Sequence, residues 1–282
     1  MRKKTKITIF LTAAILCFSK LLGYPFWDTL KSYAVMFFYD QYVQQHSTLE
    51  AKNIIFEIPN GLSTLEKDWY PMILHHHEDE RFSQYMNRPL SLDILYSFGS
   101  FDFLRGCSHY YDGDSPYYGS FYGGYAVFPE EGVFGFDKDG HVILDEIAKV
   151  PLFDQLYLVL PSIGSPPDKG IFTWKVDHIR SISSYIGYEN WIQIDTTIQT
   201  NGPAHNATGK KELGYIQYGK PHSLYASDDN YPVMEMKGRT YVKYIEELKG
   251  TFFLYVMARD LETIEACDKN FLSKARIYHL KL

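Results

Sequence analysis

Cysteine is scarce in this chain, with three residues among 282. That count is too low for a small secreted domain held together by disulfides. Excess positive charge is missing as well, because 28 lysines and arginines stand against 34 aspartates and glutamates, a net charge of −6. Nucleic-acid grooves need clustered lysine and arginine to displace counterions from phosphates, so we expect no nucleic-acid partner.

Several catalytic and nucleotide-binding motifs are also missing. The sequence contains no Gly-x-Ser-x-Gly nucleophile elbow, no Gly-x-x-x-x-Gly-Lys-Ser/Thr phosphate loop and no Gly-x-Gly-x-x-Gly dinucleotide fingerprint. It has no fixed-period repeat and no low-complexity tract. We therefore predict no cofactor, and the case for an enzyme is weakened.

The first thirty residues carry a clear signal for export. Residues 1–6 contain four cationic side chains and no acidic one, and an apolar run follows over residues 7–18. Such a run is too short to cross a bilayer as a helix, but it matches the hydrophobic core of a secretory signal. Residues 17–19 resemble the small-x-small pattern before a cleavage site. This predicts a signal peptide over residues 1–19.

An uncleaved anchor is the alternative for the same segment. As a helix, residues 7–27 would span about 31 Å at 1.5 Å per residue. Lys20 would then snorkel to the interface, with Tyr24 and Trp27 at the far side of the bilayer. In both cases residues 28–282 form a single extracytoplasmic domain. We therefore expect an exported or membrane-anchored protein of the cell envelope, periplasmic or extracellular.

Cleavage would leave two cysteines in the exported part, Cys107 and Cys267. An even count in an oxidising compartment permits a disulfide, although sequence spacing does not show whether the two Cα atoms come within reach. Two buried thiols are the alternative.

The rest of the chain mixes strand and helix patterns. Period-two alternation and short apolar runs predict strands at residues 53–58, 92–98, 152–160, 191–198, 213–218, 239–245 and 251–258, and a hairpin at 133–144. Apolar spacing near 3.6 and capping residues predict helices at residues 28–46, 63–69, 76–86, 173–186 and 260–275. A loop with two adjacent prolines marks an internal boundary near 162–170. This mixture favours an α+β fold with mostly antiparallel sheets and four or five helices, with α/β as the alternative.

Aromatic residues and glycines concentrate between positions 96 and 136, where 14 aromatic residues and 8 glycines fall within 41 positions. Rings can stack on sugars or other flat apolar faces, while hydroxyls and carboxylates make polar contacts. The sequence therefore predicts a ligand-binding surface formed by His109, Tyr110, Tyr111, Asp112, Asp114, Tyr117, Tyr118 and Tyr122. The alternative is that these rings fill the core of a glycine-hinged sheet.

Three adjacent histidines at 75–77 precede three acidic residues and suggest a metal site. A strand would place His75 and His77 on one side, and imidazole with carboxylate is a ligand set for zinc. The spacing departs from the zincin pattern, in which a second histidine follows the first by four residues. Residues 137–140 have the Asp-x-Asp-Gly letters of a calcium loop, but Gly135 falls where the first ligand belongs. We predict a solvated surface and a turn, and no metal site.

Binding without catalysis is the function that these features favour, with a glycan-like ligand or a protein as partner. An extracytoplasmic hydrolase of an envelope polymer is the alternative. It would draw on His109, Asp112, Asp114, Ser115, Glu130 and Glu131. A third interpretation is an inhibitor or immunity-type partner of a secreted toxin, since an acidic surface can block a basic active site.

Overall fold

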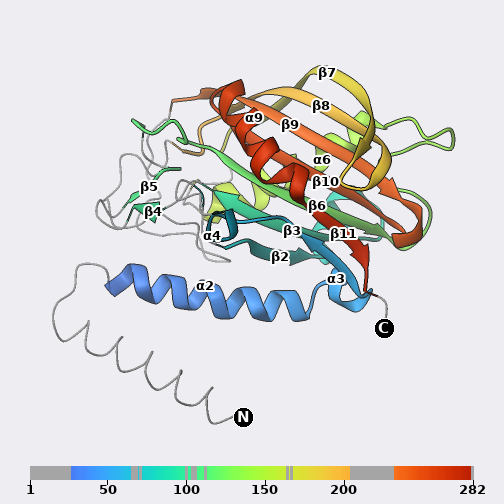
Figure 1. The fold of residues 1–282 in the computed structure, drawn as a ribbon, viewed down its shortest axis with the longest axis horizontal. Helices are drawn as coiled ribbons and strands as arrows, with labels where there is room; N and C mark the ends of the chain where they lie inside the picture. Colours follow the sequence, from blue (N-terminus) through green and yellow to red (C-terminus); the bar gives the residue numbers. More distant parts are fainter. Residues whose placement is uncertain are drawn as a thin grey trace, which may run out of the picture.

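The computed structural model describes residues 27–64, 69, 72–98, 101–102, 107–110, 113–162, 165, 168–203 and 232–280. Its main feature is a seven-stranded sheet (Figure 1) in the order β2 (Leu74–Glu78), β3 (Leu90–Phe98), β6 (Phe121–Pro129), β10 (Gly250–Ala258), β9 (Met234–Ile245), β8 (Tyr188–Thr200) and β7 (Phe172–Tyr185). Two smaller sheets pair β1 (Ile54–Glu57) with β11 (Arg276–His279), and β4 (Phe101–Asp102) with β5 (Cys107–Ser108). Every strand pair is antiparallel.

The described helices are α2 (Trp27–Gln45), α3 (Thr48–Ala51), α4 (Gly61–Thr64), α5 (Glu80–Met86), α6 (Leu144–Phe153), α7 (Leu160–Ser162) and α9 (Leu261–Asn270). A π-helix, η1 (Asp154–Val159), joins α6 to α7, and short 3₁₀ turns form η2 (Glu246–Leu248) and η3 (Leu272–Lys274). Antiparallel sheets with separate helices confirm the α+β fold class and exclude the α/β alternative for the described residues. Within this part of the chain, no helix is long and apolar enough to cross a membrane.

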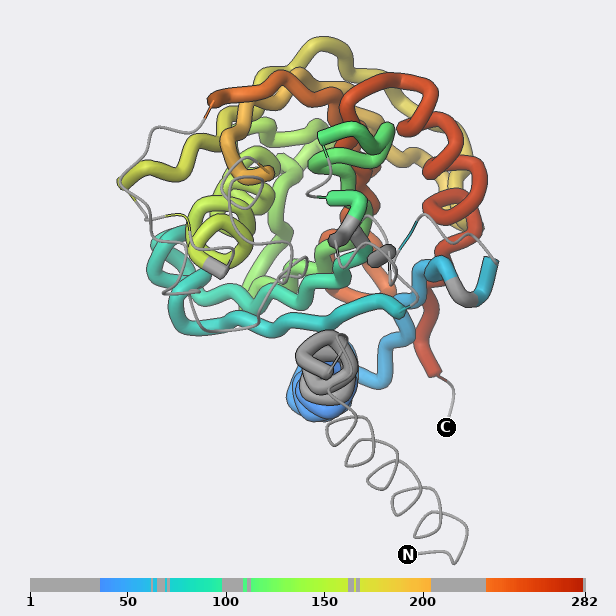
Figure 2. The backbone as a smooth tube through the Cα atoms, turned by 90° about the vertical axis from the view of Figure 1, so that its left-hand side faces the viewer, coloured from blue at the N-terminus to red at the C-terminus, as the bar shows by residue number. Residues whose placement is uncertain are grey.

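Apolar side chains cover both faces of the large sheet. Figure 2 shows the sheet curving around α6 and η1, while α9 lies on its outer face. Ile147, Val150 and Phe153 of α6 are fully buried on the inner side, and Ile264 and Cys267 of α9 are buried on the outer side. Alternating residues of the central strands thus enter two separate cores, as the period of two requires.

The two predicted parts of the chain that flank the proline-containing loop share one core. Leu160 and Phe172, on either side of the predicted boundary at 162–170, belong to the same apolar cluster. The predicted signal peptide (1–19) and the predicted strand at 213–218 lie outside the described residues, as does the predicted anchor (7–27) except for Trp27.

The helix predicted at 173–186 is wrong. These residues form β7, the first strand of a hairpin with β8. The apolar residues in this segment fit both the helical and the strand period, and β-branched side chains such as Ile179 and Ile182 favour the strand. Gly187 does not end a helix. With Ile186 it forms the two-residue hairpin turn, and both have positive φ, +44° and +87°.

The strand predicted at 152–160 is also wrong, because this segment continues α6 as η1 and α7. A short apolar run does not by itself distinguish a buried strand from a buried helix. The hairpin predicted at 133–144 is reduced to a turn with one bridge, Phe136 to Val142, before α6 begins. The predicted helix at 76–86 begins only at Glu80, because the preceding residues form β2.

The β1–β11 pair packs against the outer face of the sheet at Gly124 of β6. A Cβ atom at Gly124 would lie 2.3 Å from Cζ of Phe56 and 2.8 Å from the carbonyl oxygen of Phe253. Real Cβ atoms do not approach other heavy atoms that closely. Glycine in this aromatic-rich segment therefore allows the ring of Phe56 to reach the sheet.

We expect Gly124→Ala to lower the free energy of unfolding by about 2 kcal/mol, the cost of overpacking a filled core. Urea unfolding followed by circular dichroism measures the change. Gly113→Ala is the matched control, because nothing lies within 4 Å of its Cβ position, and its expected change is about 0.5 kcal/mol or less. Equal midpoints for the two variants would contradict the packing of Phe56 on Gly124.

Candidate functional site

A groove of about 990 Å³ opens between α2, β1 and the start of β2. One wall comes from α2, through Phe37, Gln41 and Gln44. The other wall comes from residues 54–60, which include β1 and the turn that follows it. The groove therefore lies where the N-terminal helix and the small β1–β11 sheet meet the edge of the main sheet.

The α2 wall contains a buried carboxylate that covers the edge of β2. Asp40 accepts a hydrogen bond from the backbone N–H of His75 (2.6 Å), and its Oδ1 lies 2.9 Å from His75 Nδ1. The side-chain amide of Gln44 donates to Asp40 Oδ2 at 2.8 Å. Because the outward N–H of His75 is used in this way, α2 protects the edge of β2 from pairing with another strand.

The opposite wall contains the edge of β1 that faces away from β11. This edge has no strand partner among the described residues. The N–H of Leu280 donates to the carbonyl oxygen of Asn53 at 2.8 Å. In an antiparallel ladder the bonded pairs alternate, so Ile55 also bonds toward β11. The backbone groups of Ile54 and Phe56 then point away from β11, toward the groove. Their side chains are buried in the outer core.

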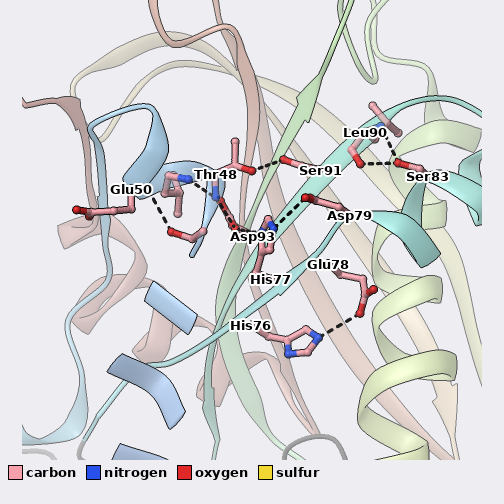
Figure 3. A network of polar contacts seen from close by, with 12 residues as sticks. Thr48, Glu50, His76, His77, Glu78, Asp79, Ser83, Leu90, Ser91 and Asp93 are labelled. Carbon is pink, nitrogen blue, oxygen red and sulfur yellow. Dashed lines mark hydrogen bonds and ion pairs between the residues drawn. The ribbon is translucent and has the colours of Figure 1, made fainter. Parts of the chain in front are cut away.

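A second histidine of β2 joins the sheet to α3 (Figure 3). His77 Nδ1 lies 2.6 Å from Oδ1 of Asp93, and its Nε2 lies 3.1 Å from Asp79. Asp93 is buried and also accepts the backbone N–H of Leu49 (2.7 Å), at the start of α3. Thr48 donates to the same carboxylate from its backbone N–H at 3.4 Å. One carboxylate thus holds an imidazole and the N-terminus of a helical turn.

The environment of His77 favours its charged form. Burial alone would lower the pKa of His77, but the hydrogen bond and negative charge of Asp93, with that of Asp79, together raise it. Glu78, next in the strand, shows the opposite direction. Burial would raise its pKa, yet hydrogen bonds from His76 and Arg81 lower it to about 2.

The histidines considered as metal ligands are therefore engaged by carboxylates. His75 contacts Asp40, and both ring nitrogens of His77 contact acidic oxygens. Among the described residues, ligand atoms gather within 4.8 Å of one another at Asp137, Asp139 and His141, and all three are exposed. Asp137 Oδ1 already accepts the backbone N–H groups of the other two, at 2.9 and 2.8 Å. This arrangement is an ordinary Asx turn.

The predicted ligand-binding residues do not share one surface in the described part. Tyr110 and Tyr122 are buried, and the hydroxyl of Tyr122 donates to the carbonyl oxygen of Pro59 at 2.8 Å. Tyr117 is half-buried with its ring edge against Trp69. These positions favour the alternative interpretation, in which the rings of this segment fill the core.

The remaining predicted residues are spread over the nearby turn. Tyr118 is half-buried with the guanidinium of Arg259 over its ring, 5.9 Å from the centroid, and Asp114 is exposed. His109 Nδ1 lies 3.0 Å from Ser115 Oγ. Tyr111 and Asp112 lie outside the described residues.

The residues considered for a hydrolase are separated along β6. Ser115 lies before the start of this nine-residue strand, whereas Glu130 and Glu131 follow its end. The hydroxyl of Ser115 is buried and accepts the backbone N–H of Tyr117 at 3.1 Å, which closes a turn.

The two cysteines of the predicted disulfide are not both described. Cys267 is buried in α9. The side chain of Cys107 lies outside the described residues, so the pairing stays a prediction.

A buried carboxylate that sequence reasoning missed lies where α6 becomes η1. Asp154 is fully buried, and the hydroxyls of Tyr96 and Tyr125 (2.7 Å) donate to it. Tyr255 stacks on Tyr125 with ring centroids 4.5 Å apart. Burial raises the pKa of Asp154 to about 6, and the hydrogen bonds from the tyrosines oppose this shift. The sequence signal for Asp154 was a charged residue inside an apolar run.

The space beside Asp154 argues for a structural role. A cavity of about 20 Å³ is lined by Tyr125, Gln155 and Tyr255, among others. That volume holds about one water molecule, whereas ligand pockets measure hundreds of Å³. Asp154 therefore joins the π-helix to β3 and β6 by hydrogen bonds, and the groove beside α2 is the better candidate for a binding site.

Comparison of the chain with protein-family models, with curated proteins and with solved structures finds no match. The function is therefore argued from the chain's own residues.

Proposed function

We propose that this protein is an exported cell-envelope protein that binds a protein partner, and that an extended segment of that partner lies in the groove along β1. The observation that carries the proposal is the edge of β1 in the wall of the groove, to which no described strand is paired. Such an edge presents backbone donors and acceptors at a fixed spacing, and an added strand satisfies them.

The dimensions of the groove support an extended peptide. Its volume of about 990 Å³ is at the upper end of the range for ligand pockets. Residues 54–60 all line it, and a strand advances about 3.3 Å per residue. A peptide of about six residues therefore fits this length. The backbone groups of Ile54 and Phe56 would supply its main-chain hydrogen bonds.

The distribution of aromatic rings favours a protein partner over a glycan. A sugar site needs ring faces that reach solvent. The buried positions of Tyr110 and Tyr122, and the contacts of Tyr117 and Tyr118, use these rings within the domain. The groove wall from α2 instead offers the exposed amide side chain of Gln41, which suits hydrogen bonding to a peptide.

Filling the groove tests the proposal. Decapeptides are selected from a random display library on the full-length chain and then measured by fluorescence anisotropy. We expect Gln41→Trp, which places a large ring in the groove, to weaken their binding at least tenfold. Gln45→Trp is the matched control, since Gln45 lies one turn further along α2 and is not among the groove-lining residues. It should change the affinity less than twofold.

Hydrogen exchange locates the peptide independently. The amides of Ile54 and Phe56 should exchange more slowly in the complex, because the added strand accepts their hydrogen bonds. Peptides that bind Gln41→Trp as tightly as wild type, or that protect other strands, would refute the assignment. Failure to select any peptide in repeated screens would count against it as well.

A further inference from the structure

Within residues 36–45, the part of α2 whose side chains the structure describes, the outer face is aromatic and uncharged. Phe37, Phe38 and Tyr42 are 49%, 70% and 60% exposed, and Phe38 is the most exposed large apolar residue of the described chain. Gln41 and Gln45 share this face and are also exposed. An exposed aromatic ridge on one helix marks a contact surface.

The inner face of the same helix is fixed to the domain. Met36 and Val43 are buried, and Asp40 between them holds the edge of β2 through His75. Figure 1 shows α2 along one side of the molecule, with the sheet on its inner side and no described element on its outer side. The direction in which the aromatic ridge points is therefore set by the fold.

The position of α2 in the chain identifies what lies against this ridge. The helix begins at Trp27, where the predicted membrane anchor over residues 7–27 ends. No linker separates the two, so an anchored chain would begin α2 at the level of the lipid headgroups. Tyrosine and tryptophan concentrate at this level because one end of each side chain is apolar and the other is polar.

We propose that α2 lies along the bilayer surface, with Phe38 and Tyr42 at the boundary between headgroups and acyl chains, while Phe37 at the side of the ridge faces the groove. This inference rests on the proposed function in the form in which residues 7–27 stay in the membrane as an uncleaved anchor, here called the anchored form. The helix is about 28 Å long at 1.5 Å per residue, so a helix standing upright would expose the ridge to water far from the membrane. Lying flat, it buries the exposed rings at the interface.

The charge of the ridge defines the kind of lipid surface. From Phe37 to Gln45 this face carries no lysine or arginine, so attraction to anionic lipids contributes little. Apolar insertion is the main contribution, and the contact should be insensitive to salt and to the fraction of anionic lipid. Phosphatidylcholine vesicles are therefore the probe.

Photocrosslinking from position 38 tests the proposal. The full-length chain with Phe38→p-benzoylphenylalanine is reconstituted into phosphatidylcholine vesicles and irradiated, and adducts are identified by mass spectrometry. We expect lipid adducts at position 38 at least tenfold above those of the control, Ile179→p-benzoylphenylalanine. Ile179 is an exposed residue of β7, at the opposite edge of the main sheet. Adding 0.5 M salt should leave the yield unchanged.

The other outcomes are equally informative. Adducts confined to a second copy of the chain or to the N-terminal segment of the same chain, or the absence of any adduct, would overturn the proposal. Carbonate extraction of the same vesicles separates its failure from that of the proposed function. A chain that resists extraction without labelling lipid at position 38 removes only the flat orientation of α2, whereas a chain released by carbonate contradicts the anchored form itself.

Discussion

Asp154→Asn is expected to remove the loss of folding free energy that ionisation of Asp154 causes as the pH rises from 4 to 7. In the folded protein burial raises the pKa of Asp154 to about 6, against 3.8 for an ordinary aspartate. The folded state therefore binds this proton more tightly than the unfolded state. Its stabilising contribution is complete below pH 4 and is lost as the pH rises through 6.

The expected size follows from the shift of about two pKa units, since each unit corresponds to about 1.4 kcal/mol. Asp154 should therefore lower the free energy of unfolding by about 3 kcal/mol between pH 4 and pH 7. Asparagine cannot ionise and keeps one acceptor oxygen, for the hydroxyl of either Tyr96 or Tyr125. The other hydroxyl can rotate to accept a hydrogen bond from the side-chain –NH₂ group. Urea unfolding of both proteins at pH 4, 5, 6 and 7 measures the difference between the two curves.

An exposed aspartate provides the matched control for this experiment. Asp139 is exposed in the turn after Asp137, so Asp139→Asn should follow the wild-type curve. Subtracting the curves cancels the other titrating groups, including Glu78. If Asp154→Asn also follows the wild-type curve, the pKa of Asp154 is not raised in the folded protein, and the prediction is wrong.

Asp93→Ala is expected to lower the free energy of unfolding by about 3 kcal/mol at pH 6. The substitution leaves His77 and the N–H of Leu49 without their buried acceptor, and each unsatisfied buried group costs about 1–3 kcal/mol. Ser91→Ala is the control between the same two elements, β3 and α3. It removes one hydrogen bond between the hydroxyls of Ser91 and Thr48, and should lower the free energy of unfolding by about 1 kcal/mol.

The loss in Asp93→Ala should also depend on pH. Because the pKa of His77 is raised in the folded protein, its stabilising contribution is complete below the pKa of the unfolded chain and disappears as the pH rises through the raised value. A double-mutant cycle with His77→Ala isolates the pair. The coupling energy should fall from pH 6 to pH 9, and a coupling that stays constant would show that the imidazole is not charged in this contact.

The sequence predicted those elements in which one period was unambiguous. Strict alternation over 92–98 and the continuous apolar run at 251–258 gave strands in the structure. Over 173–186 the apolar residues fit two periods, and only pairing with β8 selects the strand. The apolar run at 152–160 would be buried as a strand or as a helix. The packing of α6 on the inner face of the sheet selects the helix.

The candidate site was less predictable, for a physical reason. The groove arises where α2, β1 and β2 meet, and these segments are joined by long-range contacts such as that between Asp40 and His75. Residue types indicated the aromatic segment as the binding site. They could not distinguish a binding surface from a core, because aromatic rings are common in both. His75 and His77 were noticed in the sequence, but their carboxylate partners become evident only from the fold.

The far edge of the main sheet is built to discourage fibre growth. β7 is fourteen residues long and ends the sheet, so it could template one chain after another. The register of β7 against β8 shifts between Val176 and His178. Charged side chains lie around this shift, at Lys175, Asp177 and Arg180. Irregularity and charge of this kind disfavour stacking of copies. Growth of the sheet by added copies is thereby opposed at β7, while Asp40 of α2 covers the opposite edge at β2.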